Sequence, residues 1–154
     1  MDVTALAAGL LEPIPANAAL GIKVISAAEG CAEVSMPEAP DRANVVGSMH
    51  SSGLIALIDA ASLAAVIAMS DEGAPFEDIV PLGASAQLEF LAPARGGLKG
   101  RCGLDDQARA AITRLLVGQT DKVSATTNAE IHDREGLVVC RGAFDWRIRR
   151  IRPA

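Results

Sequence analysis

Residues 44–69 read NVVGSMHSSGLIALIDAASLAAVIAM, and this stretch determines what the rest of the chain can form. From Ser52 onward nearly every side chain is apolar, so the spacing predicts a helix over 52–69 that is packed on most sides. Ser51 or Ser52 is expected to cap its start, because a serine oxygen accepts a hydrogen bond from a main-chain N–H of the first turn. Gly73 follows where such a helix has to end.

Asp59 is the only formal charge between Arg42 and Asp71, and it lies in the middle of the predicted helix. A membrane span is disfavoured, because residues 53–69 fall short of about 18 apolar residues and a central carboxylate costs about 2.5–3.5 kcal/mol. A second interpretation is a purely structural core helix in which Asp59 faces a solvent-filled crevice. Functional use is favoured over it, since an isolated carboxylate in an apolar helix is costly unless it is paired, hydrogen-bonded or used in chemistry.

The composition predicts a single domain over residues 1–154 with an aliphatic core. Half of the residues are hydrophobic, aromatic residues make up 3% and tyrosine is absent, so alanine and small aliphatic side chains must provide most of the packing. The net charge of −5 argues against a general nucleic-acid binder.

Cysteine and histidine usage predicts no metal site. The three cysteines are widely spaced, no CxxC pair occurs, and two histidines cannot complete a convincing zinc site. The first residues, MDVTALAAGLLEP, include an acid at position 2 and no basic segment, which is untypical of a signal peptide. We therefore expect a cytoplasmic protein with reduced thiols that does not associate with membranes.

The remainder of the chain predicts an antiparallel sheet and two further helices. In the 79–91 strand, Leu82, Leu88 and Phe90 are expected on the covered side and Ser85 on the other. One-sided alternation in every strand is typical of an antiparallel sheet with one covered face. Only the 52–69 helix is apolar enough to cover that face, so we predict an α+β fold in which the sheet curls around it. The predicted strands are 20–24, 31–36, 79–91, 98–104, 124–132 and 138–149, and the other helices are 2–11 and 105–117.

The spacing Asn44-x2-Gly47-x2-His50-x2-Gly53-x5-Asp59 resembles the hotdog-fold acyl-CoA thioesterases, in particular the branch related to phenylacetate-pathway thioesterases. That family has an Asn and a Gly before a His-Gly-Gly, and an Asp on the helix nine residues after the His. The resemblance implies a hotdog fold, a curled antiparallel sheet around one long central helix, with 105–117 as an extra short helix between late strands. Three further segments resemble the family: LGIKV (20–24), GCAEVSMP (30–37) and LEFLAPARGG (88–97).

The resemblance implies hydrolysis of acyl-CoA thioesters without a metal or cofactor, coenzyme A being part of the substrate. A thioester carbonyl needs an N–H donor aimed at the oxygen that becomes negative, and the family implies the backbone N–H of Ser51 at the helix start. Asp59 is then the general base that activates water, or the nucleophile itself. Asn44 would orient the water or the carboxylate. His50 would hold the loop and the carbonyl, or be a structural hydrogen-bonded histidine.

Some features depart from the family pattern. Ser51 and Ser52 replace the two glycines after the histidine. Together with Gly53 they belong to the expected substrate site. The two serine side chains are expected to narrow that site or to alter the loop. Relatives often carry Ser or Thr early in the third strand, where this chain has Gly83. Ser85, two residues later on the same side, is the candidate substitute.

Two functions follow from the resemblance. The first is the thioesterase, and the alternative is a non-catalytic hotdog protein that binds acyl-CoA as a sensor or scaffold. A hotdog dehydratase fits poorly, because the proline-rich histidine loop of those enzymes is absent. We expect a homodimer or homotetramer, because a sheet wrapped on one helix has free edges that invite a second copy. The resemblance implies that the helix carboxylate of one chain then faces the histidine loop of the other.

Overall fold

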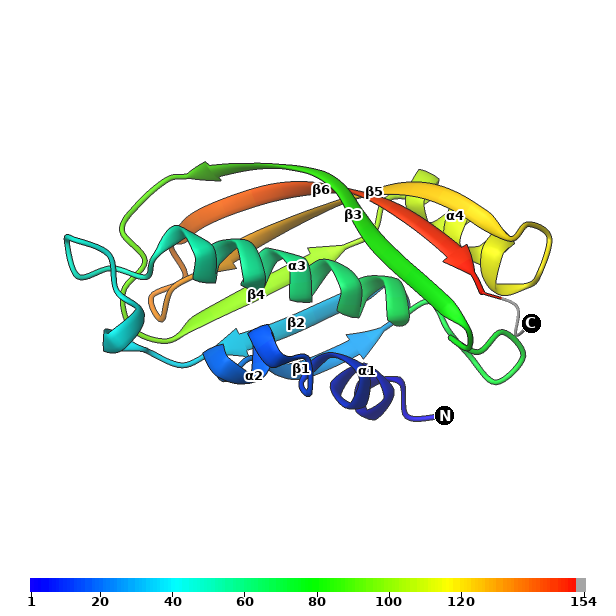
Figure 1. Ribbon diagram of the computed structural model, residues 1–154, viewed down its shortest axis with the longest axis horizontal. Coiled ribbons are helices and arrows are strands. Elements are labelled where there is room, and N and C mark those ends of the chain that lie inside the picture. Colours follow the sequence, from blue (N-terminus) through cyan, green and yellow to red (C-terminus); the bar gives the residue numbers. More distant parts are fainter. Residues whose placement is uncertain (152–154) are drawn as a thin grey trace.

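The computed structural model describes residues 1–151, which form one antiparallel sheet of six strands. The strands lie side by side in the order β1-β2-β4-β5-β6-β3. The sheet curls around α3 (Ser51–Ile67), which confirms the predicted α+β architecture (Figure 1). The strands are β1 Lys23–Ala28, β2 Cys31–Met36, β3 Ile79–Phe90, β4 Leu98–Gly103, β5 Lys122–His132 and β6 Val138–Arg150.

α3 is buried along most of its surface, because its sequence leaves almost no polar face. Leu57, Ala61 and Val66 are fully buried, and the helix packs against the inner side of β2, β4, β5 and β6. Gly100 of β4 lets the helix come close, since a Cβ there would lie only 3.1–3.3 Å from side chains of the neighbouring strand and of α3. The predicted central helix is therefore the centre of the core.

Two helices cover the β1 end of the sheet. α1 (Val3–Leu11) lies where it is predicted, and the side chain of Asp2 caps its first turn. α2 (Pro15–Leu20) differs from the prediction, which has a strand over 20–24. Proline is well tolerated in the first turn of a helix, and Gly21, with φ +68°, ends the helix, so the strand starts later than predicted.

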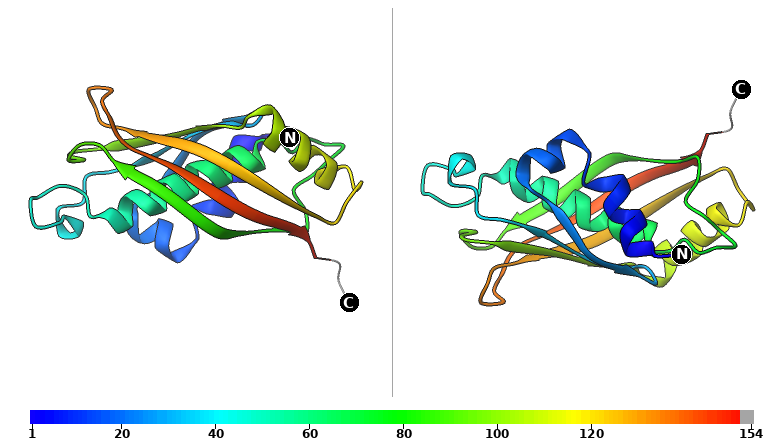
Figure 2. Two further views of the ribbon diagram at one scale, coloured as in Figure 1. Left: turned by 90° about the horizontal axis from the view of Figure 1, so that it is seen from above. Right: turned by 90° about the horizontal axis from the view of Figure 1, so that it is seen from below.

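The two edges of the sheet differ. At the β1 edge, Thr4 Oγ1 accepts a hydrogen bond from Ala27 N at 3.0 Å, and Glu12 Oε1 accepts one from Val24 N at 3.0 Å. The β3 edge has no strand beside it within residues 1–151, and most of β3 is exposed. Figure 2 shows β3 along one border of the sheet (left) and α1 and α2 near β1 (right). The open edge is therefore β3.

β3 departs from the predicted alternation at one point. Its pairing with β6 shifts between Gly83 and Ser85, which is a β-bulge. Because a shift by one residue exchanges the two sides of a strand, Leu82 lies on the outer side opposite Arg147 and is 54% exposed, contrary to the prediction. Leu88, beyond the bulge, packs against the core as predicted.

α4 (Asp106–Leu116) is the extra helix between β4 and β5 that the sequence predicts. The Asp105 side chain caps it by accepting from Ala108 N at 2.8 Å, and Gly118, with φ +77°, follows its end. A short 3-10 turn, η1 (Pro40–Arg42), precedes the loop that leads to α3. Among the helices that the structure describes, none is both long and apolar enough to cross a membrane.

Candidate active site

The first turn of α3 is capped by histidine. His50 Nδ1 accepts a hydrogen bond from Ser52 N at 3.1 Å and lies 2.8 Å from Ser52 Oγ. The predicted serine cap is therefore wrong, because the imidazole nitrogen occupies the acceptor position and the helix begins at Ser51. Since Nδ1 accepts a main-chain N–H, the neutral ring carries its proton on Nε2. Gly53 lies over Met49, where a Cβ would come within 2.5 Å of the sulfur, so a larger residue there would require the Met49 side chain to move.

The main-chain N–H of Ser51 is free. The amides of Ser52, Gly53 and Leu54 all donate to His50, either to its ring or to its carbonyl oxygen, whereas the Ser51 amide has no acceptor among the described residues. An unpaired N–H at the start of a helix is a preorganised donor at the positive end of the helix dipole. Ser51 also lines a hollow of about 380 Å³ with Asn44, Val46, Ser48, Met49, Leu54 and residues 90–94.

The side chain of Asn44 closes the loop before the helix. Its Oδ1 accepts hydrogen bonds from Val46 N at 3.1 Å and Ser48 N at 3.0 Å, and its Nδ2 donates to Ser48 Oγ at 2.8 Å. The side-chain amide of Asn44 thus forms its hydrogen bonds within its own loop. In this chain Asn44 shapes the loop that leads to His50, and its expected role of orienting the water or the carboxylate stays a prediction.

Asp59 lies two turns further along α3, on the stripe that the sheet leaves uncovered. On the same stripe Ser52 and Ile55 are exposed, and Ala56 is half-buried like Asp59 itself. The Asp59 carboxylate has no hydrogen bond or ion pair with any residue of the described part of the chain. Burial alone raises the pKa of Asp59 from 3.8 to about 6. At neutral pH the group is therefore mostly ionised and more basic than an ordinary carboxylate.

Ser51 and Asp59 lie far apart within one chain. They lie eight positions apart on one helix, which separates their main chains by about 12 Å at 1.5 Å per residue. A water that attacks a carbonyl carbon must lie within about 3.5 Å of it. This separation bears on whether the two groups work together within one chain or across two copies.

Gly83 and Ser85 lie on opposite sides of the sheet, which corrects the prediction that they share a side. The bulge between them is the cause. Gly83 faces inward, where a Cβ would lie 3.6 Å from Phe144, whose ring stacks on Trp146. Ser85 is on the outer side and donates to Asp145 Oδ2 at 2.7 Å. Ser85 therefore does not lie on the α3 side of the sheet.

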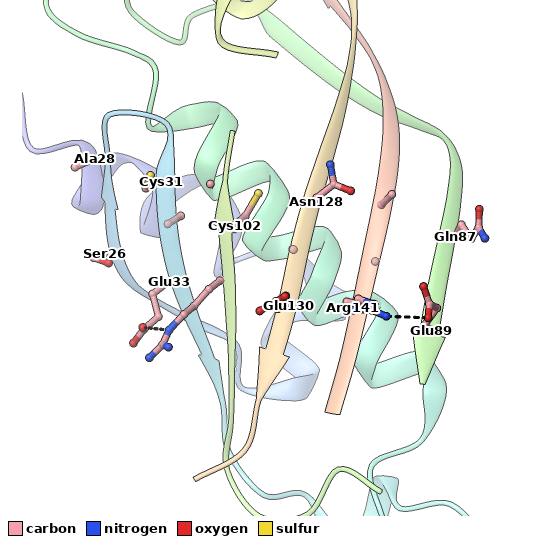
Figure 3. Close-up of a pocket in the computed structure, with 16 residues that line it drawn as sticks. Ser26, Ala28, Cys31, Glu33, Gln87, Glu89, Cys102, Asn128, Glu130 and Arg141 are labelled. Atoms are coloured by element: carbon pink, nitrogen blue, oxygen red, sulfur yellow. Dashed lines mark hydrogen bonds and ion pairs between the residues drawn. The ribbon is translucent and has the colours of Figure 1, made fainter. Parts of the chain in front are cut away.

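A hollow of about 820 Å³ lies on the outer side of the sheet, away from α3 (Figure 3). Arg101 Nε donates to Glu33 at 2.7 Å and Arg141 Nη2 donates to Glu89 at 3.3 Å. With Glu130 these residues form a row in which each charge stands opposite its counter-charge on the next strand. Such pairing is typical of a solvated sheet face. None of the predicted catalytic residues lines this hollow, and no group of three His, Cys, Asp or Glu within residues 1–151 could hold a metal ion.

The chain has the hotdog fold that the sequence predicts, because it is similar in structure to solved proteins that are described as a probable thioesterase and as a member of the thioesterase superfamily. A Pseudomonas aeruginosa protein of unknown function, described as a probable thioesterase, has a TM-score of 0.76 at 24% identity over 96% of both chains. A thioesterase family protein from Silicibacter pomeroyi has a TM-score of 0.75 at 16% identity, over 96% of this chain and 99% of that one. The E. coli PaaI protein, from the phenylacetic acid degradation operon, has a TM-score of 0.67 at 21% identity over 93% of both chains.

The sequence of the chain matches a known protein family. The chain belongs to the family described as domain of unknown function DUF4442, which it matches over residues 4–148. No curated protein shows a significant match to this chain. At these identities the solved structures establish the fold, and the chemistry has to be argued from the residues.

Proposed function

We propose that the protein is an acyl-CoA thioesterase in which the Ser51 N–H stabilises the oxyanion and Asp59 activates water. The observation that carries the proposal is the free N–H of Ser51 at the start of α3. The first N–H groups of a helix have no acceptor within the helix, and one that the cap leaves unpaired at the positive end of the dipole suits a developing negative charge. The half-buried Asp59, with its raised pKa, supports the second role.

The proposed reaction uses these two groups in one step. The thioester carbonyl oxygen accepts a hydrogen bond from the Ser51 N–H, and Asp59 removes a proton from water as the water oxygen bonds to the carbonyl carbon. The tetrahedral intermediate then collapses, the C–S bond breaks, and the coenzyme A thiolate takes up the proton that Asp59 removed from water. In the second route Asp59 attacks the carbonyl carbon itself and expels the coenzyme A thiolate, and water then hydrolyses the resulting anhydride and supplies the thiolate with a proton. Both routes need Asp59 ionised.

The site is proposed to form between two copies of the chain. The open β3 edge supports this, because strand pairing there would join two sheets. The uncovered side of the molecule also exposes Ile55 at 41%, Phe90 at 55% and Leu91 at 45%. In a two-fold dimer each surface meets its own copy, so Asp59 of each chain can face the helix start of the other, in two equivalent sites. A homotetramer would repeat this pair.

Binding of acyl-CoA without turnover is the second candidate. Gly83 has no hydroxyl group where thioesterases of this type often carry Ser or Thr, and Ser85 lies on the wrong side of the sheet to replace it. A site without that hydroxyl can still hold the ligand. The two candidates differ only in hydrolysis, so hydrolysis is what has to be measured.

Ser51→Pro is the sharpest test of the oxyanion role, because it deletes one N–H and little else. Proline is favoured at the first helical position, and His50 already has the φ of −60° and ψ of 146° that a residue before proline prefers. We expect hydrolysis to fall about 10²–10³-fold in Ser51→Pro. Ser51→Ala is the matched control and should keep most of the activity, since only the main chain is used. Equal losses in both variants would instead make the hydroxyl the reacting group.

Asp59→Asn tests the base. Short, long and aromatic acyl-CoAs are offered to the wild-type protein, and the best substrate is used for the variants. Loss of a general base should lower turnover by at least about a hundredfold with the fold intact. Asp106→Asn, which changes an exposed carboxylate of α4, should have no effect. Near-normal turnover in folded Asp59→Asn refutes the assignment, and tight acyl-CoA binding by a wild-type protein that hydrolyses none of the panel favours the sensor.

Mixing variants tests whether the site is shared. Asp59→Asn and Ser51→Pro chains are combined under conditions where chains exchange. If Asp59 of one chain works with Ser51 of the other, each heterodimer contains one intact site and recovers up to about half of the wild-type activity. No recovery in verified heterodimers, or full activity in a wild-type monomer, would show that one chain holds the whole site.

A further inference from the structure

Arg95 joins the connection between β3 and β4 to the loop before α3. Its Nη1 donates to Gly47 O at 3.2 Å and its Nη2 to Val46 O at 3.0 Å, across 48 positions of sequence. The planar guanidinium thus holds two successive main-chain carbonyl groups with two parallel donors. A lysine ammonium cannot reproduce this geometry, because it is a single point charge.

The loop over residues 44–48 has little other support. Val45 is fully exposed and Val46 is 59% exposed, so apolar packing does not hold the loop tip. Asn44 closes the loop internally, but its hydrogen bonds stay within residues 44–48. Within residues 1–151, the other hydrogen bond to the β3–β4 connection comes from just after this segment, from Met49 N to Ala94 O at 2.8 Å.

The loop leads directly into the oxyanion donor. Residue 48 is followed by Met49 and by His50, whose ring caps α3 and whose carbonyl takes the neighbouring amides, so that the Ser51 N–H remains unpaired. A shift of the loop would turn the His50 cap and with it the direction of that N–H. Misplacement of a catalytic group by about 1 Å can cost about a hundredfold in rate.

We propose that Arg95 is a positioning residue that fixes the direction of the Ser51 N–H by holding the carbonyl groups of residues 46 and 47. The inference rests on the proposed function for its kinetic consequence, but the restraint on the loop does not depend on it. Because Arg95 is exposed, direct contact with the phosphates of coenzyme A is the competing role, and it predicts a different result.

Two thioesters with the same acyl group separate these roles. One is the acyl-CoA and the other is the N-acetylcysteamine thioester, which has no phosphates. In Arg95→Lys we expect kcat to fall about tenfold with both substrates, with KM changed less than about twofold. Arg134→Lys, on the neighbouring turn and without a hydrogen bond to residues 44–48 in the described structure, should match the wild type. A loss confined to KM for the acyl-CoA would overturn the proposal in favour of phosphate binding, and unchanged kcat would overturn it outright.

Amide hydrogen exchange tests the restraint without any turnover. The amides of Ser48 and His50 are hydrogen-bonded, to Asn44 Oδ1 and Arg42 O, and should exchange about five to ten times faster in Arg95→Lys than in the wild type. The thermal unfolding temperature should change little, because the side chain is on the surface. If the wild type hydrolyses no thioester, the proposed function fails while faster exchange still supports the positioning role. Unchanged exchange at both amides would refute it.

Discussion

Replacement of Asp59 by asparagine is expected to stabilise the folded protein above about pH 6, although it removes the proposed base. The carboxylate is partly buried, has no partner within residues 1–151, and has a pKa raised from 3.8 to about 6 by burial. A raised pKa in the folded state means that the folded chain disfavours the ionised form. Asparagine has nearly the same shape and no charge, so it removes that penalty.

The sign and size of the effect follow from the two pKa values. Below pH 3.8 the carboxyl is protonated in both the folded and the unfolded chain, so the penalty is absent there. It grows between pH 3.8 and about 6 and is complete above pH 6. A difference of about two pKa units corresponds to about 2–3 kcal/mol in the free energy of unfolding. For a chain of this length that is about 5–10 °C in unfolding temperature.

Thermal unfolding of the wild type and Asp59→Asn, followed by circular dichroism near pH 8 and near pH 4, measures the effect. Protein concentration is held fixed, since oligomers unfold at concentration-dependent temperatures. The variant should be more stable near pH 8, and the difference should largely disappear near pH 4. Asp106→Asn, at an exposed position, should show no such dependence. The reasoning is refuted if Asp59→Asn unfolds at a lower temperature than the wild type near pH 8. It is also refuted if the variant exceeds the wild type by the same amount at both pH values.

Three further outcomes are expected. The kcat/KM for thioester hydrolysis should rise with pH and level off above about pH 6, because Asp59 must be ionised; an activity that falls over this range contradicts the base. Gly142→Ala should lower the free energy of unfolding in urea by about 1–3 kcal/mol, since a Cβ there would lie 2.8 Å from a neighbouring side-chain carbon, whereas Gly83→Ala, with 3.6 Å, should be nearly neutral. Trp146→Phe should cost about 1–3 kcal/mol, because it leaves the buried Thr127 hydroxyl without the indole donor at 2.9 Å.

The fold was predictable from the sequence wherever local pattern and long-range pairing agree. The apolar run after Ser52 could only be a central helix, and the alternation over 124–132 matches the buried positions of β5. The bulge in β3 was not predictable, because the residues from Leu82 to Phe90 alternate without interruption. Where a strand shifts its register is decided by its partner, here β6, and a single strand carries no sign of it.

The candidate site was predictable in part. The lone charge in an apolar helix makes Asp59 a candidate from physical chemistry alone, and the resemblance adds the main chain of Ser51; the structure shows the burial of the first and the unpaired N–H of the second, while their catalytic roles stay predictions. The sequence did not indicate that the side-chain amide of Asn44 forms its hydrogen bonds within its own loop. A short polar side chain can bond to several nearby main-chain groups, and the sequence does not show which of them it uses. Arg95 lies in a segment that supported the family resemblance, but only the folded chain brings its guanidinium to residues 46 and 47.

The closed β1 edge has a consequence for how large the assembly can become. A sheet with two open edges offers a new one after each addition, and so can grow into a fibre. In this chain Thr4 and Glu12 occupy main-chain groups of β1, and within residues 1–151 only the β3 edge remains open. A pair joined through β3 would present closed edges at both ends, so growth by strand addition terminates at two chains. In such a pair the N-terminal segment would limit growth by strand addition, and its removal would uncover the main-chain groups of β1.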